Sequence, residues 1–324
     1  MPEVSPSVLI IRLDAIGDAL ALTPSIAALR RRAITVDVVL RPSNANVFAP
    51  NAVRDVIVAD FDLRNGTRAN RNAIERLGRD LHERRYTHVL VATEDEGGYR
   101  LASAVGAPTR IGFEDPRTKP LKALWSRRIL TKSIYRSARL TAGSEHECET
   151  LFTLVEPLAR GEKPTRDLTQ VRPLVLESEP APDDRVAVQI TDKWERLGIP
   201  LASVVDLVRR LAASGELHLL SSRSESPYAQ SVERATGIAV SYFDDLPSWK
   251  AAIAAAAALV APDSGAVHVA GMTGTPVVAV FPPMRLYDAW VARWAPWATP
   301  HRIVRADEGW PARAADALAL LLST

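Results

Sequence analysis

The sequence alternates between short apolar runs and longer amphipathic runs, and it does so twice. In the first half the short runs are 8–11, 35–40, 56–58 and 88–92, and the longer runs are 19–32, 70–84 and 99–105. In the second half the short runs are 186–190, 217–220, 259–261 and 277–281, and the longer runs are 201–213, 227–236 and 248–258. Strands that alternate with helices predict a mainly parallel sheet covered on both faces. We therefore expect an α/β chain built from two similar halves.

A stretch rich in proline and acidic residues, 171–184, separates the halves and is typical of a linker. We expect a first domain at 1–170, a second domain at 185–310, and a closing helix at 311–324 that can pack back on the first domain. A chain of 324 residues has room for two such domains.

Composition narrows the class of protein. The net charge of +2 implies no polyelectrolyte partner, and no nucleic-acid motif is present, so we expect no nucleic-acid binding. The single cysteine, Cys148, cannot form an intramolecular disulfide and lies in an apolar helical run, where we expect a buried thiol. No apolar run reaches the roughly 20 residues that span a bilayer, and the first five residues lack the basic region of a signal peptide. We expect a soluble cytoplasmic protein.

A loop that opens a helix is the first candidate binding site. Residues 262–265 join the apolar run 251–261 to a helical run at 266–272. The free N–H groups and positive dipole end of a helix N-terminus suit a diphosphate. The residues concerned are Asp263, Ser264, Gly265, Ala266 and His268. The alternative is that Asp263 only caps the helix and His268 is a core residue.

Carboxylates follow two strands of the first half. Asp14 and Asp18 come after the run 8–11, and Glu94, Asp95 and Glu96 come after the run 88–92. Ligands of open α/β sheets bind beyond the carboxyl ends of the strands, so we expect these acids on the cleft face. A carboxylate there can take a proton from a substrate hydroxyl. The alternatives are N-capping by Asp18 and a solvated loop at 94–96.

The turn after the first strand also excludes one class of enzyme. It contains only Gly17, whereas the dinucleotide fingerprint of dehydrogenases needs three glycines.

Four segments, in this order, resemble glycosyltransferase family 9, the ADP-heptose:lipopolysaccharide heptosyltransferases. They are Arg12-Leu13-Asp14-Ala15-Ile16-Gly17-Asp18, Gly106-Ala107-Pro108-Thr109-Arg110-Ile111-Gly112-Phe113, His146-Glu147 and Asp263-Ser264-Gly265-Ala266-Val267-His268. The resemblance implies a glycosyltransferase-B fold, with two Rossmann-like domains whose parallel sheets face a central cleft. It implies that Asp18 is the catalytic base, with Asp14 as the fallback, and that 263–268 hold the donor diphosphate.

Further candidate site residues come partly from the resemblance and partly from their positions in the chain. Donor-side candidates are Lys193, Arg196, Glu225 and Asp244, and the acceptor-side candidates are Gly17, Glu94, Asp95, Glu96, Arg127 and Arg128. The family carries a phosphate-contacting Lys where this chain has Leu197, and Lys193 or Arg196 could substitute for it. No metal and no separate cofactor are expected, because N–H groups can stabilise the leaving diphosphate.

A basic segment lies at 115–140. Its cations, with no acid between Asp115 and Glu145, are Arg117, Lys119, Lys122, Arg127, Arg128, Lys132, Arg136 and Arg139. Apolar residues are interleaved with them, which suits an anionic membrane surface or a phosphorylated glycolipid. The alternative is the solvated face of a helical insertion.

The function implied is an inverting, metal-independent glycosyltransferase of lipopolysaccharide biosynthesis. It would transfer a heptose-like sugar from a nucleotide-diphosphate donor, ADP-heptose above all, to a lipopolysaccharide-core or related glycan acceptor. One alternative is a degenerate member that binds nucleotide sugar or glycan without turnover. Another is a sugar-nucleotide epimerase of similar architecture.

Overall fold

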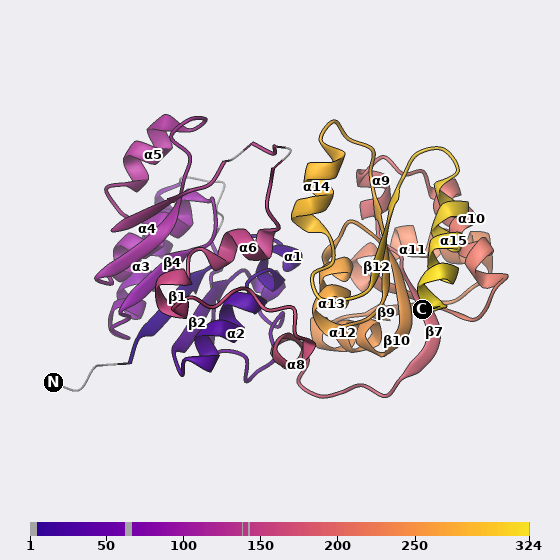
Figure 1. Ribbon diagram of the computed structural model, residues 1–324, viewed down its shortest axis with the longest axis horizontal. Helices are drawn as coiled ribbons and strands as arrows, with labels where there is room; N and C mark the ends of the chain where they lie inside the picture. Colours follow the sequence, from indigo (N-terminus) through magenta and orange to yellow (C-terminus); the bar gives the residue numbers. More distant parts are fainter. Residues whose placement is uncertain (1–4, 62–66, 138, 142, 324) are drawn as a thin grey trace. The chain divides into compact units, whose positions relative to one another are not determined.

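The computed structural model describes residues 5–61, 67–137, 139–141 and 143–323. The expectation that the chain begins without a signal peptide rests mostly on residues 1–4, which lie outside these ranges. The chain forms two compact units: the first runs up to Thr141 and includes Glu147–Thr165, and the second begins at Arg166 and includes the short segment that ends at His146. Figure 1 shows a sheet with flanking helices in each unit.

The first unit is built around a six-stranded parallel sheet in the order β3-β2-β1-β4-β5-β6. Its strands are β1 (Ser7–Ile11), β2 (Thr35–Leu40), β3 (Asp55–Val58), β4 (His88–Val91), β5 (Thr109–Glu114) and β6 (Lys132–Tyr135). Its helices are α1 (Ile16–Leu20), α2 (Thr23–Arg31), η1 (Pro42–Asn44), α3 (Arg68–His82), α4 (Glu96–Val105), α5 (Pro120–Ser126), α6 (Glu147–Phe152) and α7 (Glu156–Ala159).

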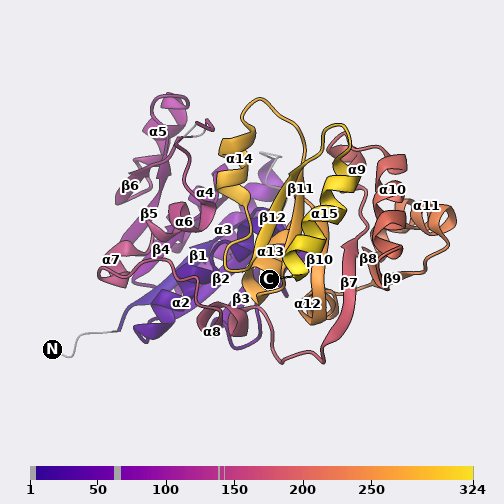
Figure 2. The same cartoon turned by 45° about the vertical axis from the view of Figure 1, so that its right-hand side comes forward.

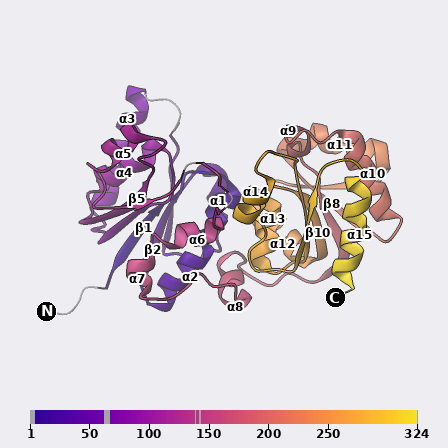
Figure 3. The ribbon, with the colours of Figure 1, turned by 45° about the horizontal axis from the view of Figure 1, so that its top comes forward.

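Helices cover both faces of this sheet. Helices α3 and α4 pack on one face and on each other, and α2 lies on the opposite face against α6 and α7 (Figure 3). Residues 8–11 of β1 are apolar without interruption and fully buried, as expected of a central parallel strand that is covered twice. The carboxyl end of β1 is thereby fixed beside that of β4, its parallel neighbour.

The second unit repeats this plan. Its sheet has the order β12-β11-β10-β7-β8-β9, and the strands are β7 (Asp183–Gln189), β8 (Leu217–Ser222), β9 (Val240–Phe243), β10 (Ala256–Pro262), β11 (Val277–Phe281) and β12 (His301–Arg305). The helices are α8 (Leu168–Val171), η2 (Arg172–Leu174), α9 (Lys193–Arg196), α10 (Leu201–Ala212), η3 (Arg223–Glu225), α11 (Ser226–Thr236), α12 (Leu246–Ala255), α13 (Gly265–Thr273), α14 (Tyr287–Trp294) and α15 (Trp310–Leu322). Helices α10, α11 and α15 share one core with the sheet, and α12 and α13 pack together (Figure 2).

Numbered within its own unit, each sheet has the strand order 3-2-1-4-5-6 of the doubly wound dinucleotide-binding fold. The order reverses direction where β1 meets β4 and where β7 meets β10. Crevices for ligands open at such switch points. The expected α/β class with two Rossmann-like units is confirmed.

Three expected boundaries are corrected. Much of the expected linker is packed: Val171, Leu174 and Val175 are buried in the second unit, and β7 already begins at Asp183. The closing helix α15 packs on α10, β11 and β12 within the second unit. The expected helix 19–32 is two helices, because the Pro24 ring would collide with the carbonyl of residue 20 in a continuous helix.

Two further expectations change for reasons of tertiary structure. The alanine-rich run leaves the helix at Ala256 and continues as β10, which is buried between β7 and β11. Sheet burial here outweighs the helix propensity of alanine. The basic segment is not a helical insertion, because it contributes the short helix α5 and then the edge strand β6.

Candidate functional site

A buried arginine organises the acidic loop after β1. Arg12 is almost fully buried and donates from Nη2 to Asp18 Oδ1 at 2.8 Å and to Glu147 Oε1 at 3.1 Å. Its Nε lies 3.4 Å from Asp14 Oδ2, and its Nη1 donates to the carbonyl of Ala92 at the end of β4. One guanidinium therefore ties both candidate bases to the switch point of the first sheet.

Asp18 is both a capping residue and an accessible carboxylate. Its Oδ2 accepts from the backbone N–H of Ala15 at 3.1 Å, at the start of α1, while its side chain remains 25% exposed. Asp18 therefore caps the helix through Oδ2, as the alternative interpretation expected, while its Oδ1 accepts from Arg12. Gly17 is buried in the first turn of the same helix.

The charges of this loop are strongly coupled. Burial alone would lower the pKa of Arg12, but Glu147, Asp18 and Asp14 outweigh it and raise that pKa. Burial raises the pKa of Asp14, Arg12 opposes this, and the neighbouring Asp18 adds to it. Arg12 was overlooked as a functional residue, although it is the first residue of the quoted motif.

The three acids after β4 have different partners. Asp95 caps α4 by accepting from Gly97 N at 2.7 Å, and burial followed by the nearby Asp14 raises its pKa. Glu94 instead accepts from Lys119 Nζ at 2.7 Å, and Glu96 is exposed beside Arg100. Only Asp95 joins the Asp14 and Asp18 loop.

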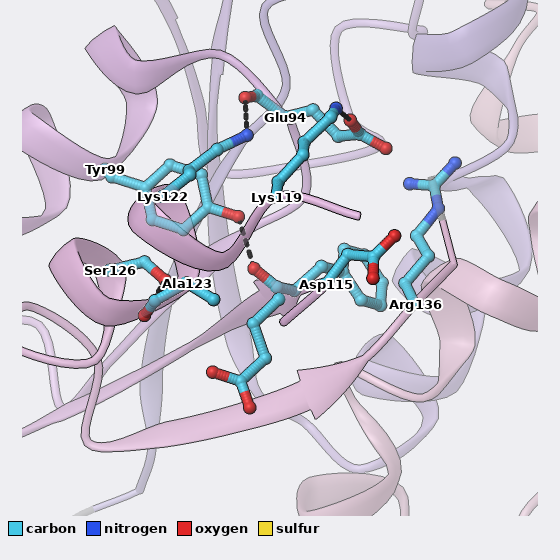
Figure 4. A pocket seen from close by; sticks show the side chains of 10 residues that line it. Glu94, Tyr99, Asp115, Lys119, Lys122, Ala123, Ser126 and Arg136 are labelled. Carbon is cyan, nitrogen blue, oxygen red and sulfur yellow. Dashed lines mark hydrogen bonds and ion pairs between the residues drawn. The ribbon is translucent and has the colours of Figure 1, made fainter. Parts of the chain in front are cut away.

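A small charged cavity lies beside this loop, at the ends of β4 and β5 (Figure 4). Its volume of about 20 Å³ has room for about one water molecule. Lys122 and Lys119 reach Glu94 across it, and Tyr99 donates to the Phe113 carbonyl at 2.6 Å. Arg136, on the cavity wall, donates from Nη2 to Glu147 Oε2 at 2.8 Å. No sequence pattern signals this pairing, because it joins residues on different elements.

In the second unit the loop after β10 presents a helix N-terminus. Asp263 is buried, and its Oδ2 accepts from Trp290 Nε1 at 2.8 Å, so it does not cap the helix. Ser264 is the N-cap of α13, and its Oγ is buried with no hydrogen-bond partner among the described residues. Gly265 and Ala266 form the first turn, where N–H groups lack intrahelical acceptors.

Aromatic side chains surround this helix start. His268 is buried on α13 and meets the Trp294 ring edge-on, with ring centroids 5.6 Å apart. Trp290 and Trp294 both come from α14, which the sequence analysis did not identify. Helix α14 therefore forms a wall beside the start of α13.

The remaining donor-side candidates lie after the neighbouring strands. Lys193 begins α9, whose Trp194 is fully buried and stacked on Trp310 at 5.4 Å. Glu225 accepts from Thr191 Oγ1 at 2.8 Å, and burial raises its pKa. Arg196 lies between Asp192 and Glu225 at 2.5 and 3.8 Å. The structure brings these residues together at the ends of β7 and β8.

Two other predicted residues have different environments. Asp244 is exposed and paired with Arg223 at 2.7 Å, so the structure does not bring it to the α13 loop. Leu197, at the position of the family Lys, packs against the core of the second unit.

The basic segment is partly neutralised, because three of its eight cations form ion pairs with described residues. Lys119, Arg127 and Arg136 pair with Glu94, Glu114 and Glu147, all from outside 115–140. Arg128 is exposed at the end of α5. These partners lie 11 to 25 residues away along the chain.

The described ranges contain no helix long and apolar enough to cross a bilayer. Nor do they hold a group of three or more His, Cys, Asp or Glu side chains arranged to bind a metal ion.

Comparison with known proteins points to one family. Residues 229–317 match the family described as glycosyltransferase family 9 (heptosyltransferase), a range that includes α13 and its loop. No curated protein matches the chain.

Solved structures share the fold over nearly the whole chain. A glycosyl transferase family 9 protein from Veillonella parvula DSM 2008 is 16% identical with a TM-score of 0.75, covering 98% of this chain and 97% of that one. E. coli heptosyltransferase WaaC with ADP is 17% identical with a TM-score of 0.72, covering 97% and 99%. E. coli ADP-heptose lps heptosyltransferase II is 16% identical with a TM-score of 0.71, covering 98% of each chain.

The shared fold with these solved structures establishes a glycosyltransferase-B architecture. Within the second unit, residues 229–317 match glycosyltransferase family 9, and this match together with the shared fold supports a glycosyltransferase.

Proposed function

We propose that this glycosyltransferase transfers a heptose-like sugar, with inversion, from an ADP-linked donor to a lipopolysaccharide-core or related glycan acceptor. The observation that carries the proposal is the start of α13, where Ser264 Oγ is buried without a partner among the described residues and N–H groups are free. A diphosphate supplies the acceptor oxygens that such groups need. A structure of WaaC with ADP-2-deoxy-2-fluoro heptose, 18% identical with a TM-score of 0.69, supports the choice of donor class.

The proposed chemistry needs one base and one anion site. Asp18 takes the proton of the acceptor hydroxyl, the oxygen attacks the anomeric carbon, and the bond from that carbon to the diphosphate oxygen breaks. The diphosphate leaves carrying the electron pair, and the N–H groups at Gly265 and Ala266 stabilise its charge. No step of this scheme calls on a metal or a separate cofactor. Asp14 remains the alternative base.

The donor site lacks the family Lys, and Lys193 is the proposed substitute. Leu197 packs against the core of the second unit, so no cation is present at the position of the family Lys. Lys193, four residues earlier, starts α9 at the end of β7, the strand next to β10. A cation there would add Coulombic attraction for the diphosphate. This keeps the catalytic proposal ahead of the alternative in which the protein binds donor without turnover.

A thermal-shift panel tests the donor class. ADP and ADP-sugars at about 100 times Kd should add roughly 2.7 kcal/mol of stability, and uridine and guanosine diphosphates should add less. Gly265→Val should abolish the ADP shift, because a branched side chain obstructs close approach of a phosphate to the helix start. Gly215→Ala, where an added Cβ meets nothing within 4 Å, is the control. Normal ADP affinity in Gly265→Val contradicts the proposed site.

Transfer assays separate the enzyme from its alternatives. Release of ADP from ADP-heptose that depends on added acceptor supports transfer. Binding without release supports the degenerate member, and conversion of the sugar without an acceptor supports an epimerase.

We also propose that helix α5 meets an anionic lipid surface while the glycolipid acceptor is bound. Leu121 and Leu124 are 83% and 58% exposed, three residues apart on one helix, and Arg128 follows them. Apolar side chains beside cations suit an anionic bilayer. Vesicles containing an anionic lipid should bind the protein, and Leu121→Ser with Leu124→Ser should release it. Equal binding to neutral vesicles would contradict the electrostatic part.

A further inference from the structure

We propose that Glu147 and Arg136 are positioning residues that set the charge balance under the base loop. The inference deepens the proposed function, because it assumes that Asp18 is the base. Neither residue would touch the substrate in this role. They would act through Arg12, which holds Asp18 directly.

The first support is the geometry of a continuous chain of ion pairs. Arg12 Nη2 donates to both Asp18 Oδ1 at 2.8 Å and Glu147 Oε1 at 3.1 Å. Arg136 Nη2 then donates to Glu147 Oε1 at 3.0 Å and Oε2 at 2.8 Å. The chain thus runs from the α1 start through α6 to the residue after β6.

Burial is the second support. Glu147 is fully buried and Arg12 almost so, whereas Asp18 at the end of the chain is a quarter exposed. Burying an ion pair costs desolvation free energy that the pair itself often fails to recover. A buried acid on two arginines is therefore weak support for a role in stability. Its position one guanidinium away from Asp18 is better explained by a role in the site.

The charge count gives the direction of the effect. Arg12 and Arg136 carry two positive charges, and Asp14, Asp18 and Glu147 carry three negative charges when ionised. Removing the Glu147 charge leaves two of each, which favours ionised Asp18. Removing the Arg136 charge leaves one positive against three negative, which favours the protonated form. The two substitutions should act in opposite directions.

Other charged groups face this cluster and stay unchanged in the test. Asp95 on the start of α4 acts on Asp14, and Lys122 and Arg41 act on Asp95. Glu94 interacts with Arg136 and with Lys119. Arg136 also lies over the Phe113 ring, 5.1 Å from its centroid. Because these groups are common to all variants, the difference between variants reports on Glu147 and Arg136.

The experiment is the pH dependence of kcat/KM for transfer from ADP-heptose, which reports the free enzyme's essential base. Glu147→Gln should move the acidic limb to lower pH, and Arg136→Gln should move it to higher pH, each by about one pH unit. On that limb a one-unit shift is about a tenfold change in kcat/KM. Loss of packing alone would lower the whole profile without opposite shifts.

Two further variants keep the result decisive. Arg136→Lys keeps the charge, so its limb should stay in place even if kcat falls. Glu162→Gln, which breaks the exposed pair with Arg31 in the same unit, should leave the profile unchanged. If Glu147→Gln does not fold, the Arg136→Gln profile alone decides. The inference is then overturned if the acidic limb of that profile does not move to higher pH.

Failure of the inference and failure of the function look different. If the wild type transfers no sugar from any nucleotide donor, the proposed function is wrong. If the wild type is active, Asp18→Asn is impaired and neither limb shifts, only the positioning role is wrong.

Discussion

The two units share a strand order and differ in what they place at its switch point. The first unit puts carboxylates there: Asp14 and Asp18 after β1, and Asp95 after β4. The second puts a helix start there, at Ser264 after β10, with Lys193 after β7. Identical topology therefore fixes where a ligand can bind, while the loop residues decide which charge is offered.

Each unit also carries an acid at its loop, and the two acids are held in different ways. In the first, Arg12 pairs with Asp18 and leaves the carboxylate partly exposed. In the second, the Trp290 indole holds Asp263, which stays buried. An accessible carboxylate such as Asp18 suits a base. A carboxylate held away from the ligand, as Asp263 is by Trp290, suits a site that binds an anion.

The largest expected effect is on the presented acid. Asp18→Asn keeps the shape but removes the basicity, so kcat should fall by about 10²- to 10⁴-fold with ADP affinity little changed. Steady-state kinetics and calorimetric ADP binding check this. Full activity in Asp18→Asn together with loss in Asp14→Asn would transfer the role of base to Asp14.

Buried cations offer a second contrast, in stability. The acids around Arg12 raise its pKa, whereas burial lowers the pKa of Lys250 in the second unit to about 8. The unfolded chain then holds more protons than the folded one between about pH 8 and 10.5, so folding stability should rise with pH in that window. The rise should be at most about 3 kcal/mol. Urea unfolding at pH 7 to 10 should show the rise in the wild type and less of it in Lys250→Met.

Close packing around one glycine in each unit should make the stability of that unit sensitive to a Gly→Ala substitution. A Cβ on Gly78 would lie 2.2 Å from Ala104 Cβ where α3 meets α4, and one on Gly271 would lie 2.8 Å from Trp297 N. Either Gly→Ala substitution should cost about 1–3 kcal/mol through overpacking. Hydrogen exchange should locate the loss in the first unit for Gly78→Ala and in the second for Gly271→Ala. Equal loss in both units from either variant would show that they unfold as one.

The smallest expected effect tests the restrained acid. Trp290→Phe removes the hydrogen bond to Asp263. The freed carboxylate can then turn toward the helix start and repel the diphosphate, so ADP binding should weaken by about 1 kcal/mol, roughly fivefold. Trp294→Phe makes the same chemical change where Nε1 has no partner among the described residues, so its ADP affinity should be unchanged. Equal weakening by both would point to ring packing instead.

The missed strands show where sequence patterns lose their power. Strands β6, β9 and β12 are edge strands, with one neighbour each, and β12 reads His301-Arg302-Ile303-Val304-Arg305. An edge strand is half covered, so polar residues are tolerated and the apolar signal weakens. The strand β5 was missed for a related reason, since Ile111 and Phe113 are its only large apolar residues and polar residues flank them.

The sequence by itself determined the α/β class, the two halves, and the loops that carry Asp18 and Asp263. These follow from local periodicity and from residues adjacent in the chain, which a sequence displays directly. Only the tertiary structure decided that Glu147 and Arg136 lie beneath the Asp18 loop, that Trp290 restrains Asp263, and that Glu94 neutralises Lys119. The partners in these contacts lie 25 or more residues apart along the chain, except for Arg136 and Glu147, which belong to different elements. Such pairs arise from the winding of strands and helices around a sheet, and no spacing rule along one chain encodes them.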